Sequence, residues 1–180
     1  MKKLFMILPL ALILCFMVGC QDKEAMAELE EMKAQAEVEE QNKDVVRKFL
    51  EELDRGNIEN VVELFAPSFL WYTPSNSPNP MSREEVYEFL KMVFIAFPKW
   101  QHKIEEIIAV GDKVITRTIG YTTHEGEFQG IPATGNKVEF GVIVIFRIEE
   151  GKIVEMREEG DMLGMMMQLG MELKPKEADQ

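Results

Sequence analysis

The chain has 180 residues, of which 46% are hydrophobic and 29% charged, and its formal net charge is −12. This length and composition indicate one globular domain with additional segments. An acidic chain without a basic patch repels phosphate backbones, so no nucleic-acid partner is expected. The two cysteines, Cys15 and Cys20, both precede the domain, which leaves it without a disulfide or a catalytic thiol.

The first segment has the features of a secretion signal. Lys2 and Lys3 precede an apolar run of about 15 residues, shorter than the roughly 20 needed to cross a bilayer. The run ends in Met17-Val18-Gly19-Cys20, which resembles the bacterial lipobox. The resemblance implies a lipoprotein signal peptide over residues 1–19 and a lipidated Cys20, on the cell membrane or outer membrane and facing outside the cytoplasm. An ordinary secretory signal with a chance cysteine is the alternative.

Residues 20–41 are predicted to form a charged helical tether. The segment is rich in Ala, Glu, Gln and Met and contains no Gly or Pro, which favours a helix. Met26, Leu29 and Met32 make a thin apolar stripe. A solvated spacer and a short coiled coil with a second copy both fit this stripe.

The domain is predicted over residues 42–170, followed by a disordered tail over 171–180. Its helical patterns come first and its strand patterns later, which indicates an α+β fold with an antiparallel meander. Ser82 and Glu85 form a capping box that starts the third helix. Period-two alternation around Ile104 predicts a strand with one inward face, carrying His102, Ile104, Glu106, Ile108 and Val110. The expected elements are helices over 41–54, 58–65, 82–97 and 162–169, strands over 69–73, 100–110 and 114–124, and a hairpin that turns at residues 149–152.

The second strand of this hairpin is dense in charge. Alternation places Glu155, Arg157, Glu159 and Asp161 on one face. A two-residue turn would require a positive φ at Glu150, so a three-residue loop is preferred. That loop pairs Ile145 with Glu155, Ile143 with Arg157, Gly141 with Glu159, and Glu139 with Asp161.

The opposite face of the hairpin is apolar, and it carries Phe140, Val142, Val144, Phe146, Val154 and Met156. If the charged face lines a pocket, this apolar face needs cover from outside the chain. A second subunit would supply that cover, so a homodimer is expected.

Four stretches in order resemble the SnoaL-like polyketide cyclase (ester cyclase) family of the nuclear-transport-factor-2-like superfamily. They are VRKFLEELDRGNIENVVELFAPSF (46–69), FPKWQHKIEEIIAVGDKV (97–114), GEFQGIPATGNKVEF (126–140) and FRIEEGKIVE (146–155), the last followed by Asp161. The resemblance covers about residues 42–169. It implies a cone-shaped (cystatin-like) α+β barrel, in which a curved sheet wraps around helices and encloses a ligand pocket.

The same resemblance implies that Asp161 is the acid/base of a cyclase, isomerase or hydrolase type reaction on a small apolar or carbonyl-bearing molecule. Glu159 and Glu139 would raise the pKa of Asp161, whereas Arg157 would lower it. Family members commonly carry a tryptophan where this chain has Arg157, which indicates a different ligand. An ordinary solvated strand end is the alternative for this group.

Further candidates surround the expected pocket mouth. His124 is a candidate for proton transfer, or a surface histidine; Arg117 would orient an oxygen-bearing ligand, or pair with a carboxylate. The remaining candidate ligand-binding residues are Trp71, Tyr72, Trp100, His102, Glu155, Arg157 and Glu159. The aromatic members would stack on a planar ligand or pack in the core. No metal or cofactor is expected, because the domain lacks cysteine and a close histidine–carboxylate spacing.

The methionines of the last helix, Met162, Met165, Met166 and Met167, resemble an adaptable lid or simply cap the core. The sequence therefore supports three functional hypotheses. The chain is an acid/base enzyme of the polyketide-cyclase-like or ester-cyclase-like lyase or isomerase type, a non-catalytic small-molecule-binding protein, or a dimeric scaffold.

Overall fold

The computed structural model describes the backbone of residues 7–174 and the side chains of residues 23–174. The predicted lipobox and most of the predicted tail lie outside the residues whose side chains are described. The chain divides into two compact units, Met1–Val38 and Glu39–Gln180. In the first unit, helix α1 (Ile7–Asp54) begins, and its Met26, Leu29 and Met32 are exposed. No helix in the described residues is both long and apolar enough to cross a membrane.

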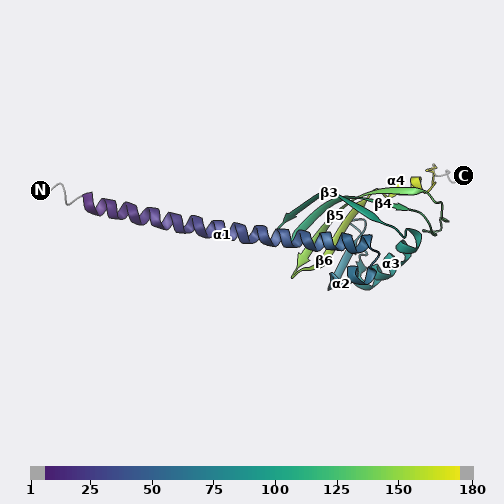
Figure 1. Cartoon of the computed structure of the whole chain (residues 1–180), viewed down its shortest axis with the longest axis horizontal. Coiled ribbons are helices and arrows are strands. Elements are labelled where there is room, and N and C mark those ends of the chain that lie inside the picture. The colour runs from purple at the N-terminus through teal and green to yellow at the C-terminus, as the bar shows by residue number, and fades with distance from the viewer. Residues whose placement is uncertain (1–6, 175–180) are drawn as a thin grey trace. The chain divides into compact units, whose positions relative to one another are not determined.

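The second unit is an α+β domain, as the sequence predicts. The end of α1 is followed by two further helices and the first strands, and then by the long strands (Figure 1). The elements are α2 (Ile58–Glu63), β1 (Phe65–Tyr72), β2 (Met81–Ser82), α3 (Arg83–Ala96), β3 (Gln101–Val110), β4 (Lys113–Thr123), β5 (Lys137–Glu149), β6 (Lys152–Gly160) and α4 (Met162–Gln168).

All six strands form one curved sheet in the order β2-β1-β6-β5-β4-β3. The strands β3 to β6 make the expected antiparallel meander, and the end of α1 packs against β5 through Phe49, whose ring centroid lies 5.6 Å from that of Phe146. The early strand β1 pairs in parallel with the late strand β6, so that Trp71 lies beside Met156. This long-range pairing completes the concave wall.

Local contacts fix the helices to the sheet. The carboxylate of Glu39 accepts a hydrogen bond from the Gly111 backbone, and Asn42 donates one to the Gly111 carbonyl, which anchors α1 to the β3–β4 turn. The predicted capping box starts α3: Glu85 N donates to Ser82 Oγ at 3.3 Å, and Ser82 N donates to Glu85 at 2.7 Å.

The predicted inward face of β3 is wrong over its second half. The pairing shifts between Ile104 and Glu106, so that Glu105 is the extra residue of a β-bulge. A single extra residue exchanges the two faces of the strand that follows. Consequently Ile108 and Val110 are exposed, 52% and 65%, whereas Ile107 and Ala109 pack against the core.

The predicted hairpin register is also wrong, by two residues. Glu150 and Gly151 form a two-residue turn with φ of 50° and 72°, so Glu150 adopts the left-handed conformation that the three-residue loop was meant to avoid. This backbone matches the twist of paired strands better than an ordinary turn does. With a further irregularity at Arg147–Ile148, Ile145 pairs with Arg157 and Ile143 with Glu159.

A shift of two residues preserves which side chains share a face, but the face predicted to line the pocket is the outer one. The even-numbered residues of β5 and β6 point inward, and Val144, Phe146 and Met156 are buried in the main core with Phe49 of α1. The odd-numbered residues of β5 and, from Glu155 onward, of β6 face outward, whereas Ile153, on the other side of the irregularity at Arg147–Ile148, is buried in the core. The apolar face therefore covers the domain's own interior and needs no second subunit.

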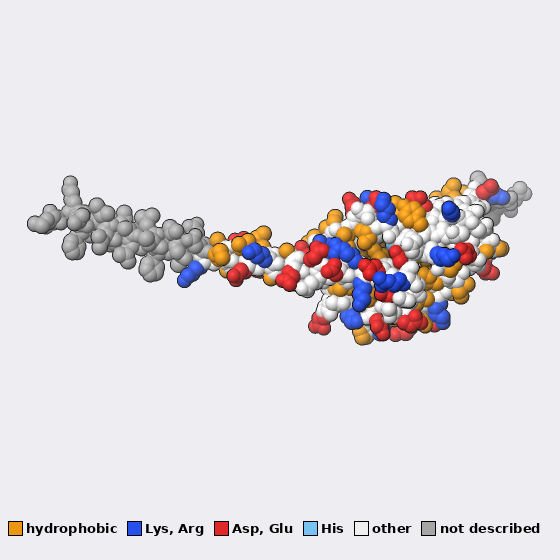
Figure 2. Space-filling view, viewed as in Figure 1, with side chains coloured by type: hydrophobic (Ala, Val, Ile, Leu, Met, Phe, Trp, Pro, Cys, Tyr) orange, Lys and Arg blue, Asp and Glu red, His pale blue; other side chains and the backbone are white. Residues whose placement is uncertain are grey.

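The outer surface carries both signs of charge. In Figure 2 the acidic and basic side chains of the domain intermix on the face shown, with apolar side chains between them. Several exposed carboxylates are paired with neighbouring cations, for example Glu40 with Arg47 at 2.8 Å and Glu88 with Lys91 at 3.0 Å. Such exposed pairs contribute little to stability.

Candidate functional site

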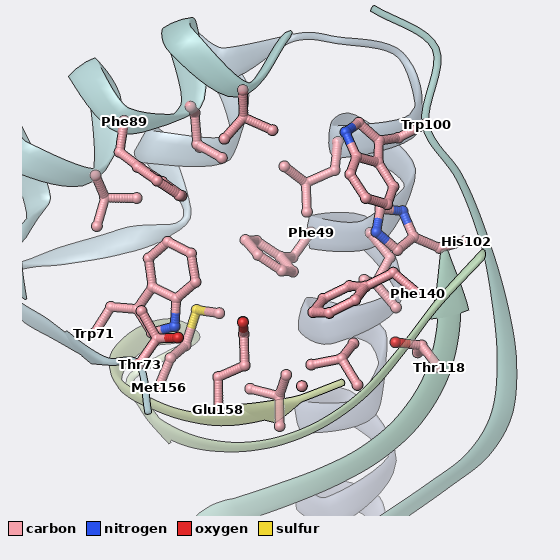
Figure 3. A pocket seen from close by; sticks show the side chains of 18 of the residues that line it. Phe49, Trp71, Thr73, Phe89, Trp100, His102, Thr118, Phe140, Met156 and Glu158 are labelled. Carbon is pink, nitrogen blue, oxygen red and sulfur yellow. The ribbon is translucent and has the colours of Figure 1, made fainter. Parts of the chain in front are cut away.

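The concave side of the sheet encloses a cavity of about 610 Å³. This volume lies within the range of small-molecule sites. Most of its wall is apolar or aromatic, contributed by α1, α3, the sheet and α4 (Figure 3). The polar or ionisable side chains of the wall are those of Thr73, His102, Thr116, Thr118, Gln129, Glu158 and Glu159.

Two glycines make room for the aromatic wall. A Cβ on Gly120 would lie 2.6 Å from the ring of Trp100, and a Cβ on Gly160 would lie 2.3 Å from the ring of Phe140. Real contacts of this kind are not that short, so both positions need glycine for the rings to lie against the sheet. The sequence therefore positions Trp100 and Phe140 through residues on the neighbouring strands.

Glu158 is the carboxylate that points into the cavity (Figure 3). Burial among the apolar walls raises the pKa of Glu158 to about 7, and the charge of Glu159 adds to the effect. The side chains of Thr73 and Trp71 act in the opposite direction. The Trp71 indole faces the carboxyl, but its buried Nε1 forms no hydrogen bond with any of the described residues.

A histidine–aspartate pair forms another part of the wall. His102 Nδ1 lies 2.5 Å from Asp54 Oδ1, and the His102 backbone N–H donates to the same carboxylate at 3.0 Å. The imidazole stacks on Trp100, with ring centroids 5.7 Å apart and an interplanar angle of 13°. Glu158 and His102 are therefore candidate proton-transfer groups of the cavity wall.

Three polar atoms of wall residues have no hydrogen-bond partner within the described residues. They are Nε1 of Trp71, Nε1 of Trp100 and Oγ1 of Thr116, all buried. Burying a polar atom without a partner costs free energy, so such atoms are normally satisfied. A ligand with oxygen acceptors would satisfy the two indole donors.

Four of the predicted site residues line the cavity: Trp71, Trp100, His102 and Glu159. Glu159 lies at the rim, where its carboxylate accepts hydrogen bonds from the backbone N and hydroxyl of Ser75. It thereby holds the loop that follows β1.

Four other predicted ligand-binding residues lie on the outer face. Arg117 pairs with Glu106 at 3.1 Å and is 45% exposed. Arg157 donates to Glu155 at 2.8 Å and lies 4.0 Å from the ring centroid of Tyr72. Tyr72, Glu155 and Arg157 thereby join β1 to β6 on the convex side, because outward residues of neighbouring strands meet there.

Asp161 begins α4 rather than lining the cavity. Its Oδ1 accepts a hydrogen bond from Gly164 N at 2.8 Å, and its side chain is exposed. An aspartate at this position satisfies a backbone N–H at the start of a helix. The methionines of α4 lie in two environments: Met162 and Met165 line the cavity, whereas Met167 is exposed.

His124 is completely buried, and the alternative of a surface histidine is wrong. Its Nδ1 lies 3.1 Å from Thr134 Oγ1 and accepts from Thr134 N at 3.3 Å, while the ring stacks on Phe97. It is absent from the cavity wall. His124 therefore holds the loop over 124–136 closed.

Sequence reasoning missed Glu158 and Asp54. The alternation of the strand offered a signal for Glu158, because it shares its face with Met156 and not with the charged residues on either side. Asp54 ends the predicted first helix, and no local pattern connects it to His102. No group of three or more metal-ligating side chains occurs in the described part of the chain.

A curved sheet that closes over helices around one deep apolar pocket defines the nuclear-transport-factor-2-like cone. The chain belongs to the SnoaL-like polyketide cyclase family, whose profile matches residues 43–169.

Curated relatives agree with this assignment. The chain is 30% identical over 132 residues to aklanonic acid methyl ester cyclase DauD of Streptomyces sp. (strain C5), covering 71% of this chain and 80% of the relative. It is also 30% identical over 131 residues to aklanonic acid methyl ester cyclase DnrD of Streptomyces peucetius, covering 71% and 89%.

Solved structures share the fold. IdmH, described as a putative polyketide cyclase from Streptomyces antibioticus, superposes with a TM-score of 0.64 at 28% identity, over 72% of this chain and 99% of that one. AclR, a putative hydroxylase from Streptomyces galilaeus, superposes with a TM-score of 0.68 at 24% identity, over 73% and 97%, and shows the fold alone.

Proposed function

We propose that the domain is an acid/base enzyme of the cyclase or isomerase type that acts on a small apolar, carbonyl-bearing molecule, with Glu158 as its general base. The observation that carries the proposal is an ionisable carboxyl inside an apolar cavity, with its pKa raised by burial to about 7. A base of that pKa is half ionised at neutral pH and strong enough to take a proton from carbon next to a carbonyl.

The cavity supports the same chemistry. Its aromatic walls suit a planar apolar ligand, and exclusion of water strengthens the interactions of a developing enolate. The unpartnered indole N–H groups of Trp71 and Trp100 are donors for ligand oxygens. Both relatives named as cyclases act on an ester of aklanonic acid, and this ester is therefore the first substrate to test.

Glu158 takes the role that the family resemblance assigns to Asp161. Asp161 is exposed and caps α4, and it does not line the cavity, whereas Glu158 does. The two carboxylates lie three residues apart, so one can serve as the control for the other.

Two assays test the proposal on the full-length protein. The first follows conversion of aklanonic acid methyl ester by liquid chromatography and mass spectrometry. The second follows exchange of the α-protons of 1-tetralone, a planar aryl ketone, in deuterated buffer by proton NMR. We expect Glu158→Gln to lower both rates by about 10²–10⁴-fold and Asp161→Asn to change them less than threefold. The reverse pattern would assign the base to Asp161, and no effect of either variant would refute the proposal.

A non-catalytic binding protein is the second candidate. Three buried polar atoms of the wall form no hydrogen bond with the described residues, and the predicted acid/base Asp161 serves as a helix cap. Calorimetric titration with 1-tetralone separates the two. Binding without exchange of protons identifies a binding protein, and exchange that depends on Glu158 identifies an enzyme.

We further propose that the chain is anchored to a membrane through lipidated Cys20, outside the cytoplasm. The support is the charged start, the apolar run and the lipobox-like Met17-Val18-Gly19-Cys20. Labelling of expressing cells with an alkyne fatty acid should mark the protein, and Cys20→Ser should abolish the label. A label that persists in Cys20→Ser would contradict the anchor.

A homodimer remains a proposal, now through the convex face of the sheet. Ile108, Ile115, Ile143 and Ile145 are each at least 37% exposed there, and β3, β4 and β5 bring Ile108, Ile115 and Ile145 into one row. Sedimentation velocity should show a dimer that Ile145→Lys converts to a monomer. A wild-type protein that sediments as a monomer at all concentrations would remove the proposal.

A further inference from the structure

The His102 ring is held from one side by a carboxylate. Asp54 receives two bonds from the same residue, the backbone N–H at 3.0 Å and the ring Nδ1 at 2.5 Å. The Trp100 ring stacks on one face of the imidazole. Both His102 and Trp100 line the cavity, so this arrangement presents an oriented imidazole to any bound molecule.

Asp54 is itself firmly placed. It is the last residue of α1, and the chain reverses directly behind it at Gly56, whose φ is +70°. Two residues before it, the buried Glu52 accepts hydrogen bonds from Asn57 at 2.8 Å and Asn60 at 2.9 Å. These bonds fix the helix end, and with it the carboxylate that faces His102.

The pair determines which ring nitrogen is available. An ionised carboxylate can only accept, so Nδ1 of His102 carries the proton in this contact. The other nitrogen, Nε2, forms no hydrogen bond within residues 23–174. It is therefore the nitrogen that can exchange a proton with a ligand.

We propose that His102 is the proton donor to the carbonyl oxygen of the bound molecule and that Asp54 is its positioning residue. This inference rests on the proposed function and gives it a second proton-transfer group.

The step balances between two groups. Glu158 takes a proton from the carbon next to one carbonyl, and the electron pair of that C–H bond becomes the enolate. The enolate carbon forms a bond to a second carbonyl carbon, or returns to the ketone in simple exchange. The oxygen that gains the electron pair takes the proton from Nε2 of imidazolium His102. Proton transfer from Glu158 to His102 through solvent restores both groups.

The two groups lie on different strands. In the sheet order β6-β5-β4-β3, two strands separate Glu158 from His102, and the concave curvature of the sheet turns both side chains toward the cavity that they line. Figure 3 shows both side chains facing the hollow, with Phe49 and Phe140 between them. A ligand seated against these two rings would have its reacting centre between the two groups, with the C–H bond toward Glu158 and the carbonyl oxygen toward His102.

The second histidine offers an internal control. Nδ1 of His124 accepts a hydrogen bond from the Thr134 backbone N–H at 3.3 Å, so its proton belongs on Nε2. His102 and His124 are the two histidines of the sequence, and the structure thus assigns them opposite tautomers.

The first test reads the tautomers directly. Long-range proton–nitrogen NMR on the ¹⁵N-histidine-labelled full-length protein near pH 8 should show His102 protonated at Nδ1 and His124 at Nε2. Asp54→Asn should shift His102 toward a mixture and leave His124 unchanged. A wild-type His102 protonated at Nε2 would overturn the inference.

The second test uses the 1-tetralone exchange assay. His102→Asn keeps an N–H donor where Nδ1 lies and so preserves the bond to Asp54, but it removes Nε2, the nitrogen proposed to donate to the ligand. We expect a fall in rate of about 10²-fold with an unchanged melting temperature. His102→Gln also lacks the imidazole, and it is measured alongside in case His102→Asn does not fold. Asp54→Asn should lower the rate about 10-fold and alter its pH profile.

The outcomes separate this inference from the proposed function. If Glu158→Gln abolishes exchange while folded His102→Asn and His102→Gln keep the wild-type rate, only the role of His102 is refuted. If the wild-type protein exchanges no deuterium, both are refuted. A loss with both His102 variants, together with the expected tautomer, supports the donor role.

Discussion

The two faces of the β5–β6 hairpin show how one sequence segment serves two environments. Glu158 and Glu159 are adjacent carboxylates on β6, yet one points into an apolar cavity and the other lies at the exposed rim against Ser75. Burial raises the pKa of Glu158 to about 7. Charge density along a strand therefore does not locate a reactive group, because the solvation of each side chain decides its chemistry.

The same division holds for apolar residues. Phe146 is completely buried, whereas its neighbour Ile145 is 40% exposed. Inward residues of this hairpin contribute to both the core and the cavity wall. Substitutions on the two faces should therefore differ in size as well as in kind.

The largest effect is expected from a matched pair of truncations. Phe146→Ala should lower the free energy of unfolding by about 3–5 kcal/mol, because it removes a buried ring and leaves a cavity. Ile145→Ala should lower it by less than about 1 kcal/mol in the monomer. Urea denaturation at low protein concentration measures both. Equal losses would contradict the assignment of the two faces.

Glu158 should make stability depend on pH. Its folded pKa of about 7 exceeds its ordinary 4.5, so the folded state binds the extra proton. Stability from this group is complete below pH 4.5, falls as the pH rises to 7, and then stays constant. Glu158→Gln should therefore be about 1–3 kcal/mol more stable than wild type at pH 8, with little difference at pH 4.

Thermal unfolding of Glu158→Gln and Glu159→Gln across this pH range tests the prediction. Glu159→Gln is the matched control at the rim and should gain much less stability at pH 8, because the charge of Glu159 is the smallest cause of the raised pKa of Glu158. A similar gain in both variants would show that general charge repulsion, and not burial of Glu158, is responsible.

Two glycines provide a finer comparison. Gly160→Ala should destabilise by about 1–3 kcal/mol and weaken binding of 1-tetralone, because the new Cβ would push the Phe140 ring into the cavity. Gly141→Ala, on the outer face, meets no atom within 4 Å and should be neutral or slightly stabilising. Melting temperatures and calorimetric titrations would show the difference, and an unchanged affinity in Gly160→Ala would exclude this wall position.

The smallest effect is expected at Asp161. Asp161→Ala should cost about 1 kcal/mol through loss of the bond to Gly164, whereas Asp161→Asn should cost almost nothing, since both residues are good N-caps. Chemical denaturation is precise enough to separate them. A large loss of stability in Asp161→Asn would indicate a role beyond capping.

Local signals in the sequence predicted most of the fold. The capping box at Ser82, the turn at Gly111 and the order of helices and strands depend on neighbouring residues, and the structure has them. The parallel pairing of β1 with β6 depends on residues about 85 positions apart along the chain, and no local pattern specifies it.

The candidate site was predicted less well, for physical reasons that particular residues show. The bulge at Glu105 reversed the face of β3, and alternation alone does not reveal an extra residue. The aromatic residues Trp71 and Trp100 and the histidine His102 were found, because apolar or amphipathic side chains near strand ends commonly line pockets. Glu158 was missed, because which face of β6 points inward depends on packing against α1 and α3.

The pairing of the first strand with the last also bears on how the protein is made. Trp71 and Glu158 meet only when β6 inserts between β1 and β5, and β6 is the last of the six strands along the chain. The other five strands of the sheet are therefore synthesised before the concave wall can close. Until then β1 has an open edge and the aromatic wall is incomplete, so this domain should depend on protection from aggregation during synthesis.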